Sequence, residues 1–278
     1  MDGLNNFRPA ILERAGNRPL LLRFKYRIRV SNPITLTNYS GWITNTIAKK
    51  MLSINNISPH LIQVSPLATR NMQRYITKSP YPLTLGVYEF IVTTYFKDPL
   101  LLTRLVKHSY VEIENERCSI EGVEFQPIIL ENLRYGKYPE CFYLIFRTPT
   151  RMGKKLTSII AGKMIYELLP TPTYIFGTLA TIWNKIADDT EMKIDVKKYV
   201  EWVKKHVIIT PPYKLKSYTI RLKDEKEISG FVGKIGYRSA KPETYEHAIT
   251  IILARLSQYT GIGLGRKLGM GITKYIES

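Results

Sequence analysis

Residues 259–274 read Y-T-G-I-G-L-G-R-K-L-G-M-G-I-T-K and join a helical pattern to a short strand-like tail. Glycine lets the backbone adopt positive φ angles, and successive exposed N–H groups can form a concave seat for an anion. The spacing fits neither the dinucleotide fingerprint nor the phosphate loop that ends in Lys-Ser/Thr. A flexible terminal linker is the alternative, but the ordered flanks disfavour it. The stretch therefore predicts a loop that binds a phosphate backbone through Gly261, Gly263, Gly265, Arg266, Lys267, Gly269 and Gly271.

The composition indicates a globular protein with a polyanionic partner. The 278 residues are 44% hydrophobic, enough for two medium-sized domains with their own cores. A formal net charge of +18 attracts polyanions, of which nucleic acid is the commonest. The two cysteines predict neither a disulfide framework nor a zinc site. The sequence has no apolar run of transmembrane length and no signal-like start. We therefore expect a soluble cytoplasmic protein without a cofactor or metal.

The first half begins with alternating apolar and basic residues, which predicts a strand over residues 23–30. Its open face would carry Arg23, Lys25, Arg27 and Arg29, and their uniform sign favours a surface that binds polyanions. An edge strand protected by charge is the alternative interpretation. A helix then extends to residue 52, with Trp42, Ile43, Ile47 and Leu52 on its buried side. Strands over residues 61–64, 83–96, 110–113 and 116–129 and a helix over 100–108 complete this half.

The second half repeats the same order of elements. Strands are predicted over residues 141–147, 216–222 and 228–237, and helices over 173–187, 195–206 and 247–259. Two similar topologies in tandem predict an α+β protein with two ferredoxin-like (RRM-like) domains and a C-terminal glycine-rich loop. The stretch 132–140 contains Gly136 and Pro139 and is the best boundary. The predicted domains are residues 1–135, with the candidate catalytic histidine, and residues 136–278, with a hairpin and the loop.

Several motifs together resemble the RAMP superfamily, the repeat-associated RNA-binding proteins of CRISPR systems. The glycine-rich stretch resembles the superfamily's C-terminal loop. G-F-V-G-K-I-G-Y at residues 230–237 is similar to the hairpin of its repeat-processing endoribonucleases. P-T-P at 170–172, with I-F at 175–176 and W-N at 183–184, resembles one of their helices. G-W-I at 41–43, His60 and V-S-P-L at 64–67 follow the order around their catalytic region. The resemblance extends over about residues 20–278.

This resemblance implies a metal-independent endoribonuclease that cuts precursor CRISPR RNA within each repeat to give guide crRNAs. The 2′-hydroxyl next to the scissile phosphate attacks it, leaving a 2′,3′-cyclic phosphate and a 5′-hydroxyl. Such chemistry needs a base, a cation for the crowded phosphorane and an acid. No His/Asp/Glu cluster of the sequence has metal-ligand spacing, so no metal is expected. The implied partners are repeat RNA and precursor crRNA, with effector-complex subunits and a second copy of the chain as further candidates and no membrane.

The resemblance also points to individual residues. His60 matches the family's histidine and is the candidate acid or base, although a histidine at a strand entrance can have a purely local role. Thr44 stands near the place of the family's first-helix tyrosine, and Tyr39, one turn away, is a substitute. The family's lysine is missing from residues 61–66, where Arg70 is the first cation to follow. Candidates for the charge-stabilising role are therefore Lys49, Lys50 and Lys234.

For RNA binding, the loop with Arg266 and Lys267 ranks first and the four strand cations second. Lys234 and Arg238 are candidates to hold the base of an RNA stem. Two other functions stay open. A catalytically inactive RAMP subunit that binds crRNA in an effector complex would need the loop but not His60. A general RNA-binding or RNA-modifying protein would show no preference for one cleavage position.

Overall fold

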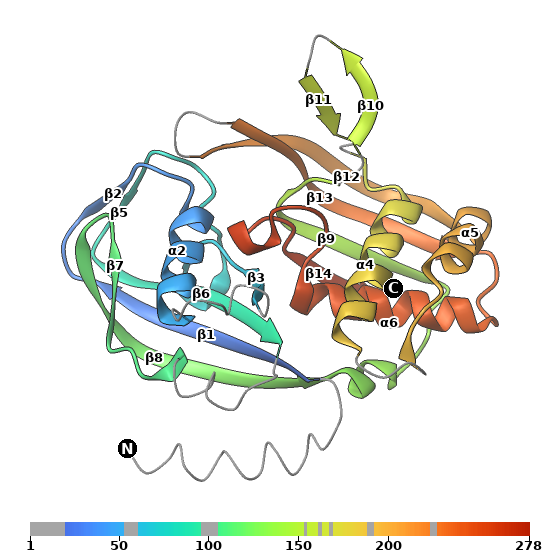
Figure 1. Ribbon diagram of the computed structural model, residues 1–278, viewed down its shortest axis with the longest axis horizontal. Helices are drawn as coiled ribbons and strands as arrows, with labels where there is room; N and C mark the ends of the chain where they lie inside the picture. Colours follow the sequence, from blue (N-terminus) through green and yellow to red (C-terminus); the bar gives the residue numbers. More distant parts are fainter. Residues whose placement is uncertain are drawn as a thin grey trace.

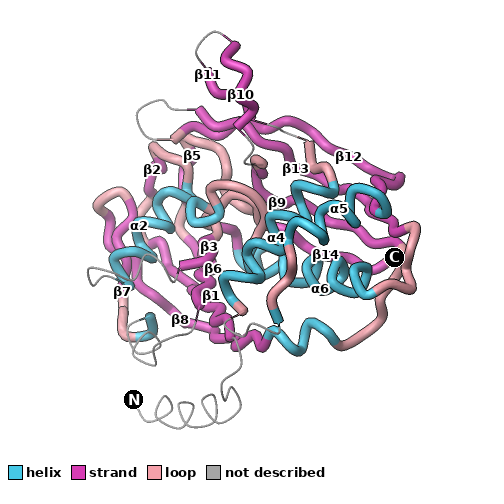
Figure 2. Tube along the Cα trace, turned by 45° about the vertical axis from the view of Figure 1, so that its right-hand side comes forward, coloured by secondary structure: helices cyan, strands magenta, loops and turns pink. Residues whose placement is uncertain are grey.

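A computed structural model describes residues 20–52, 61–95, 105–152, 155–160, 163–166, 169–187, 192–222 and 227–278. Two antiparallel sheets lie side by side, and helices cover the same side of both (Figure 1). Figure 2 shows α2 on the N-terminal sheet and α4, α5 and α6 on the C-terminal sheet. No helix of the described part is long and apolar enough to cross a membrane.

The N-terminal sheet is built around a central strand. Its strands are β1 (Leu20–Val30), β3 (Leu61–Val64), β4 (Ala68–Thr69), β6 (Gly86–Tyr95), β7 (Tyr110–Ile113) and β8 (Glu116–Ile129). Their order is β3-β6-β1-β8-β7, and β4 pairs with β6. β2 (Ile34–Leu36) and β5 (Tyr81–Leu83) form a separate small ladder. The helix α2 (Ser40–Leu52) packs on one face, because the alternating apolar residues of β1 all point towards it.

The C-terminal sheet has the order β12-β13-β9-β14. Its strands are β9 (Cys141–Thr150), β12 (Val207–Arg221), β13 (Glu227–Ser239) and β14 (Thr273–Glu277). The helices are α4 (Pro172–Ile186), α5 (Val196–His206) and α6 (Tyr245–Thr260). A hairpin of β10 (Lys155–Ile160) and β11 (Lys163–Tyr166) projects from the body between β9 and α4 (Figure 1).

Both sheets use the strands in the same spatial order. In chain order, β1, β3, β6 and β8 correspond to β9, β12, β13 and β14, and each set is arranged second-third-first-fourth. This is the βαββαβ arrangement of a ferredoxin-like fold, so the predicted tandem α+β architecture is confirmed. The predicted division at residues 135/136 falls between the short 3₁₀ helix η2 (Leu130–Arg134) and β9. That each half folds on its own stays a prediction.

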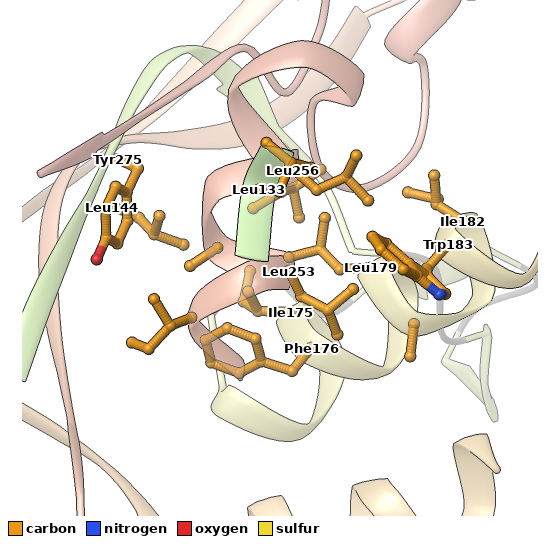
Figure 3. Packing of buried hydrophobic residues seen from close by; sticks show 14 of the residues in the cluster. Leu133, Leu144, Ile175, Phe176, Leu179, Ile182, Trp183, Leu253, Leu256 and Tyr275 are labelled. Atoms are coloured by element: carbon orange, nitrogen blue, oxygen red, sulfur yellow. The ribbon is translucent and has the colours of Figure 1, made fainter. Parts of the chain in front are cut away.

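Each half has its own hydrophobic core. In the C-terminal half, α4 and α6 pack on the sheet through Ile175, Phe176, Leu179 and Leu253, and on Leu144 and Tyr275 of the strands (Figure 3). Pro172 begins α4, where a missing N–H costs nothing, and Asp195 caps α5 by accepting a hydrogen bond from the Lys198 amide.

Three details of the sequence interpretation need correction. Trp42 is 36% exposed, because it points away from the sheet on a helix whose buried face runs through Ile43 and Ile47. The edge-strand alternative for residues 23–30 is wrong, since β1 pairs with strands on both sides. β9 continues to Thr150 and β12 already begins at Val207, so both strands are longer than predicted. The predicted helix over residues 100–108 lies largely outside the described residues.

Candidate active site

The glycine-rich loop, residues 261–272, lies where the two halves meet. It connects α6 to β14 and places its 3₁₀ turn, η5 (Arg266–Leu268), beside α2 and β3 of the other half (Figures 1 and 2). Gly41 permits this approach, because a Cβ at that position would lie 2.2 Å from the carbonyl oxygen of Leu268. Gly269 also packs closely on Pro66, just after β3, where a Cβ would lie 2.8 Å from the proline Cδ. The loop is thus a tight structural joint rather than a linker.

The glycines have the backbone conformation that the sequence predicts. All five have positive φ angles, between 66° and 85°. The seat of exposed amides, however, is largely absent within the described structure. The Ile262 amide donates to Gly271, the Leu264 amide to Arg151 and the Gly271 amide to Pro149, and the Gly261 and Gly269 amides bond to carbonyl groups within three or four residues. Most amides therefore hold the loop in shape, which leaves recognition of a ligand mainly to side chains.

Positive side chains gather around this loop. Arg266 donates through Nη1 to the Thr260 carbonyl at 3.3 Å, and burial lowers its pKa. Burial also lowers the pKa of Lys267, and the charges of Lys49, Arg266 and Lys185 lower it further. We call these four residues the junction cluster. They come from the end of α2, the end of α4 and the loop, so the fold places four positive charges near one another. Such an arrangement favours a bound anion.

Lys185 is a member of the junction cluster that was not among the residues predicted from the sequence. It follows the W-N pair at 183–184 and stands near the end of α4, where the helix dipole alone accounts for a lysine. The fold brings it close enough to Lys267 of the loop for its charge to lower the pKa of Lys267. Lys50, in contrast, pairs with Glu112 at 3.0 Å, away from the loop. The structure therefore separates two adjacent lysines that the sequence presents as equivalent.

Tyr39 and Thr44 support the joint from within. The Tyr39 side chain is fully buried, and its hydroxyl donates to the Gly269 carbonyl at 3.0 Å. Burial raises the pKa of this phenol well above its usual value. Thr44 is also buried and donates to the Ser65 carbonyl at 2.7 Å. Neither hydroxyl is accessible to a ligand in this arrangement, so the structure gives them a positioning role in place of the predicted chemical one.

His60 lies outside the described residues. Its chain neighbour Leu61 begins β3, and β3 contacts the η5 turn of the loop. Within the described ranges, no group of three or more His, Cys, Asp or Glu side chains is arranged to hold a metal ion.

The strand cations of β1 are largely neutralised by neighbouring strands. Lys25 lies 3.0 Å from Glu89, which is 1% exposed, and 3.5 Å from Glu124. Arg29 pairs with Glu121 and Arg27 approaches Glu124 at 3.8 Å. Arg23 is largely buried beside the Tyr259 ring, and burial lowers its pKa. The acids that the strand itself lacks are supplied by β6 and β8, so the expected uniformly basic surface is absent here.

Lys234 and Arg238 lie on the face of the C-terminal sheet opposite its helices. They alternate along β13 with the buried Ile235 and Tyr237. The Lys234 ammonium lies 3.8 Å from the centre of the Tyr143 ring, and Arg238 approaches Glu140 at 3.5 Å. These two cations therefore belong to a different surface from the junction cluster.

Comparisons with known proteins agree with this geometry. Residues 144–273 match the family model of CRISPR-associated endoribonuclease Cas6. A comparison with curated proteins gives no match. Among solved structures, a Cas6 product complex has a TM-score of 0.71 at 17% identity and covers 92% of this chain and 100% of its own. A Cas6 substrate mimic complex gives 0.68 at 16% identity, covering 92% and 99%. Thermus thermophilus Cas6 gives 0.65 at 16% identity, covering 92% and 98%.

Proposed function

Because residues 144–273 match the Cas6 family model and 92% of the chain shares the fold of a solved Cas6 structure, we propose that this protein cleaves precursor CRISPR RNA within its repeats. The observation that carries the proposal is the junction cluster. Lys49, Lys185 and Arg266 surround Lys267 from both halves; burial lowers the pKa of Lys267, and the charges of these three neighbours lower it further. An RNA phosphate placed there would relieve this repulsion.

The proposed mechanism needs no resident metal ion. The 2′-hydroxyl attacks the adjacent phosphorus, the bond to the 5′-oxygen of the next nucleotide breaks, and a 2′,3′-cyclic phosphate and a 5′-hydroxyl result. In the phosphorane the non-bridging oxygens gain negative charge, which fixed cations stabilise more than they stabilise the ground state. We assign this role to Lys49 and Lys267. We keep His60 as the acid or base, because it directly precedes β3 in the sequence and β3 contacts the η5 turn of the loop.

The experiment is cleavage of an end-labelled CRISPR repeat RNA in EDTA, beside a copy with 2′-deoxyribose at the scissile nucleotide. One cut in EDTA that the 2′-deoxy substitution abolishes is the expected result. Tight binding of the matching repeat without a cut would refute the proposal and favour an inactive RAMP subunit. Cutting at many unrelated positions would refute it in favour of a general RNA-acting protein.

Two adjacent lysines provide a matched pair of variants. Lys49→Gln removes a member of the junction cluster, whereas Lys50→Gln removes the same charge one residue later, from a pair with Glu112. We expect the first to lower the single-turnover rate by about 10²-fold, in the range for loss of one transition-state contact, and the second to leave it nearly unchanged. Equal effects would show that net charge, and not the junction, governs cleavage.

Association with effector subunits or a second copy stays a prediction, which size-exclusion chromatography with light scattering can test.

A further inference from the structure

Helix α5 stands outside the βαββαβ arrangement. It lies between α4 and β12, where the N-terminal half has no described counterpart. Its buried residues are Tyr199 and Val203. The Tyr199 hydroxyl forms a hydrogen bond of 2.8 Å with Thr250 Oγ1 of α6. Val200 packs against Gly177 of α4, so the helix is firmly attached. Because the fold is complete without α5, the composition of its outer side calls for a separate explanation.

That outer side is strongly basic. Residues 193–206 contain five exposed lysines and two acids. One acid, Asp195, caps the helix and lies 3.8 Å from the Lys198 ammonium. Lysines at i, i+1, i+7 and i+8 repeat on one side of the helix. The four that define this surface, here called the α5 patch, are Lys197, Lys198, Lys204 and Lys205.

An aromatic ring borders the α5 patch, and Glu201 lies among its four lysines. Trp202 is half-buried, with its ring centre 5.3 Å from that of His206. A shallow hollow of about 550 Å³ lies over these rings; Lys197, Lys198 and Lys205 line it together with the carboxylates of Asp195 and Glu201, so its lysines outnumber its acids by one. Lysines around an indole combine phosphate attraction with a ring on which a base can stack, as in proteins that bind single-stranded nucleic acid.

The basic surface continues onto the neighbouring strand. After α5, the chain enters β12, the outermost strand of the C-terminal sheet. There Tyr213 is 62% exposed, and Lys214 and Lys216 are exposed as well. An extended polyanion could therefore follow cations from the helix onto the sheet edge.

The α5 patch is remote from the junction cluster's α2 member. Figure 1 places α5 and α2 on opposite sides of α4. The α4 member of the cluster, Lys185, is nearer to α5, because the neighbouring Asn184 exchanges hydrogen bonds with Ile194 just before α5. RNA that contacts Lys49 at the junction would therefore extend past α4 to reach the α5 patch. We propose that the α5 patch binds the backbone of single-stranded RNA that flanks the cleaved repeat. This inference rests on the proposed function, since it takes the substrate to be a precursor longer than one repeat.

The test compares two RNAs and three proteins. One RNA is the minimal repeat, and the other has single-stranded extensions on both sides. The α5 variant replaces Lys197, Lys198, Lys204 and Lys205 with glutamine, which is a good helix former. The control makes the same charge change at exposed residues elsewhere: Arg74, Lys78, Lys107 and Lys137 to glutamine.

Wild-type protein and the control should bind the extended RNA more tightly than the repeat, whereas the α5 variant should bind both equally. If all four lysines contact phosphates, the slope of log K against log salt for the extended RNA should be less steep by about 3 units in the α5 variant. If the α5 variant and the control both lose the tighter binding of the extended RNA, the proposal is overturned, because overall positive charge then explains that binding. If the α5 variant binds the extended RNA as tightly as wild type, the proposal is also overturned. The basic side of α5 would then face solvent or bind an acidic protein.

The two proposals fail in different ways. If wild-type protein neither binds nor cuts the minimal repeat, the proposed function fails. If it cuts the minimal repeat but gains no affinity from the extensions, only the role of α5 fails. Circular dichroism of the α5 variant should show unchanged helix content, because all four side chains are exposed.

Discussion

Replacing Tyr39 with phenylalanine separates a positioning role from a chemical one. The substitution keeps the ring in its buried place but removes the hydroxyl that donates to the Gly269 carbonyl at 3.0 Å. The carbonyl then lacks this donor inside the protein, which costs about 1–3 kcal/mol. With a shift of roughly 2–4 °C per kcal/mol for proteins near this size, the melting temperature should fall by about 2–12 °C.

Cleavage should respond much less than if Tyr39 were a proton donor or acceptor. Burial raises the pKa of its phenol well above the usual value, so the group does not titrate near neutral pH. The expected result is a single-turnover rate within about tenfold of wild type and an unchanged pH–rate profile. A general acid or base contributes about 10²–10⁴-fold.

The assay is single-turnover cleavage of repeat RNA from pH 5 to 9, beside thermal melts of the same preparations. A rate loss above about 10²-fold with an unchanged melting temperature would refute the positioning role. It would mean that the hydroxyl leaves its partner and reaches the RNA. A lower melting temperature with nearly normal chemistry would support the role.

Three further changes probe the same joint and its surroundings. Gly41→Ala places a methyl group 2.2 Å from the Leu268 carbonyl, so η5 must move from α2, and repeat binding measured by filter assay should weaken more than tenfold. Lys267→Gln should weaken RNA binding while the melting temperature of free protein holds or rises, because its surroundings disfavour the charge. In wild type the unfolded chain keeps this proton up to about 10.5 while the folded chain releases it earlier. Stability should therefore rise with pH over that window, and chemical denaturation of the variant should lack the rise. Lys25→Gln leaves the buried Glu89 without its 3.0 Å partner, so it should cost up to about 3 kcal/mol in urea melts without weakening RNA binding.

Much of the architecture was predictable because the elements have strong local signals. Pro172, the cap at Asp195 and the alternation along β1 each determine an element from a few residues. The repeated order of strands and helices then limits the topology to two copies of one arrangement. Trp42 was misplaced because the buried side of α2 also contains small and polar residues such as Ser40, Gly41 and Asn45, which the apolar pattern alone does not identify.

The candidate site was less predictable, since it depends on contacts between distant segments. The four β1 cations looked like a binding surface because their glutamate partners lie on other strands, about 60 to 100 residues away. Lys185, in contrast, was not predicted to belong to the site, because it interacts with Lys267 of a loop some 80 residues later. Charge along one strand or helix says little about charge across a packed surface.

The duplicated fold explains why the site is placed at the junction. Each ferredoxin-like half buries a core, and the C-terminal core continues into the N-terminal half, where it includes Leu21, Tyr95, Ile128, Leu130 and Leu133. The small cluster of Tyr39, Ile220, Leu222 and Met270 lies between them, together with hydrogen bonds such as that from Arg147 to the Met72 carbonyl. The junction cluster works against this contact by placing like charges at the same joint. A phosphate backbone bound there would remove the repulsion and strengthen the contact between the halves, so substrate binding and a correctly assembled site would reinforce each other.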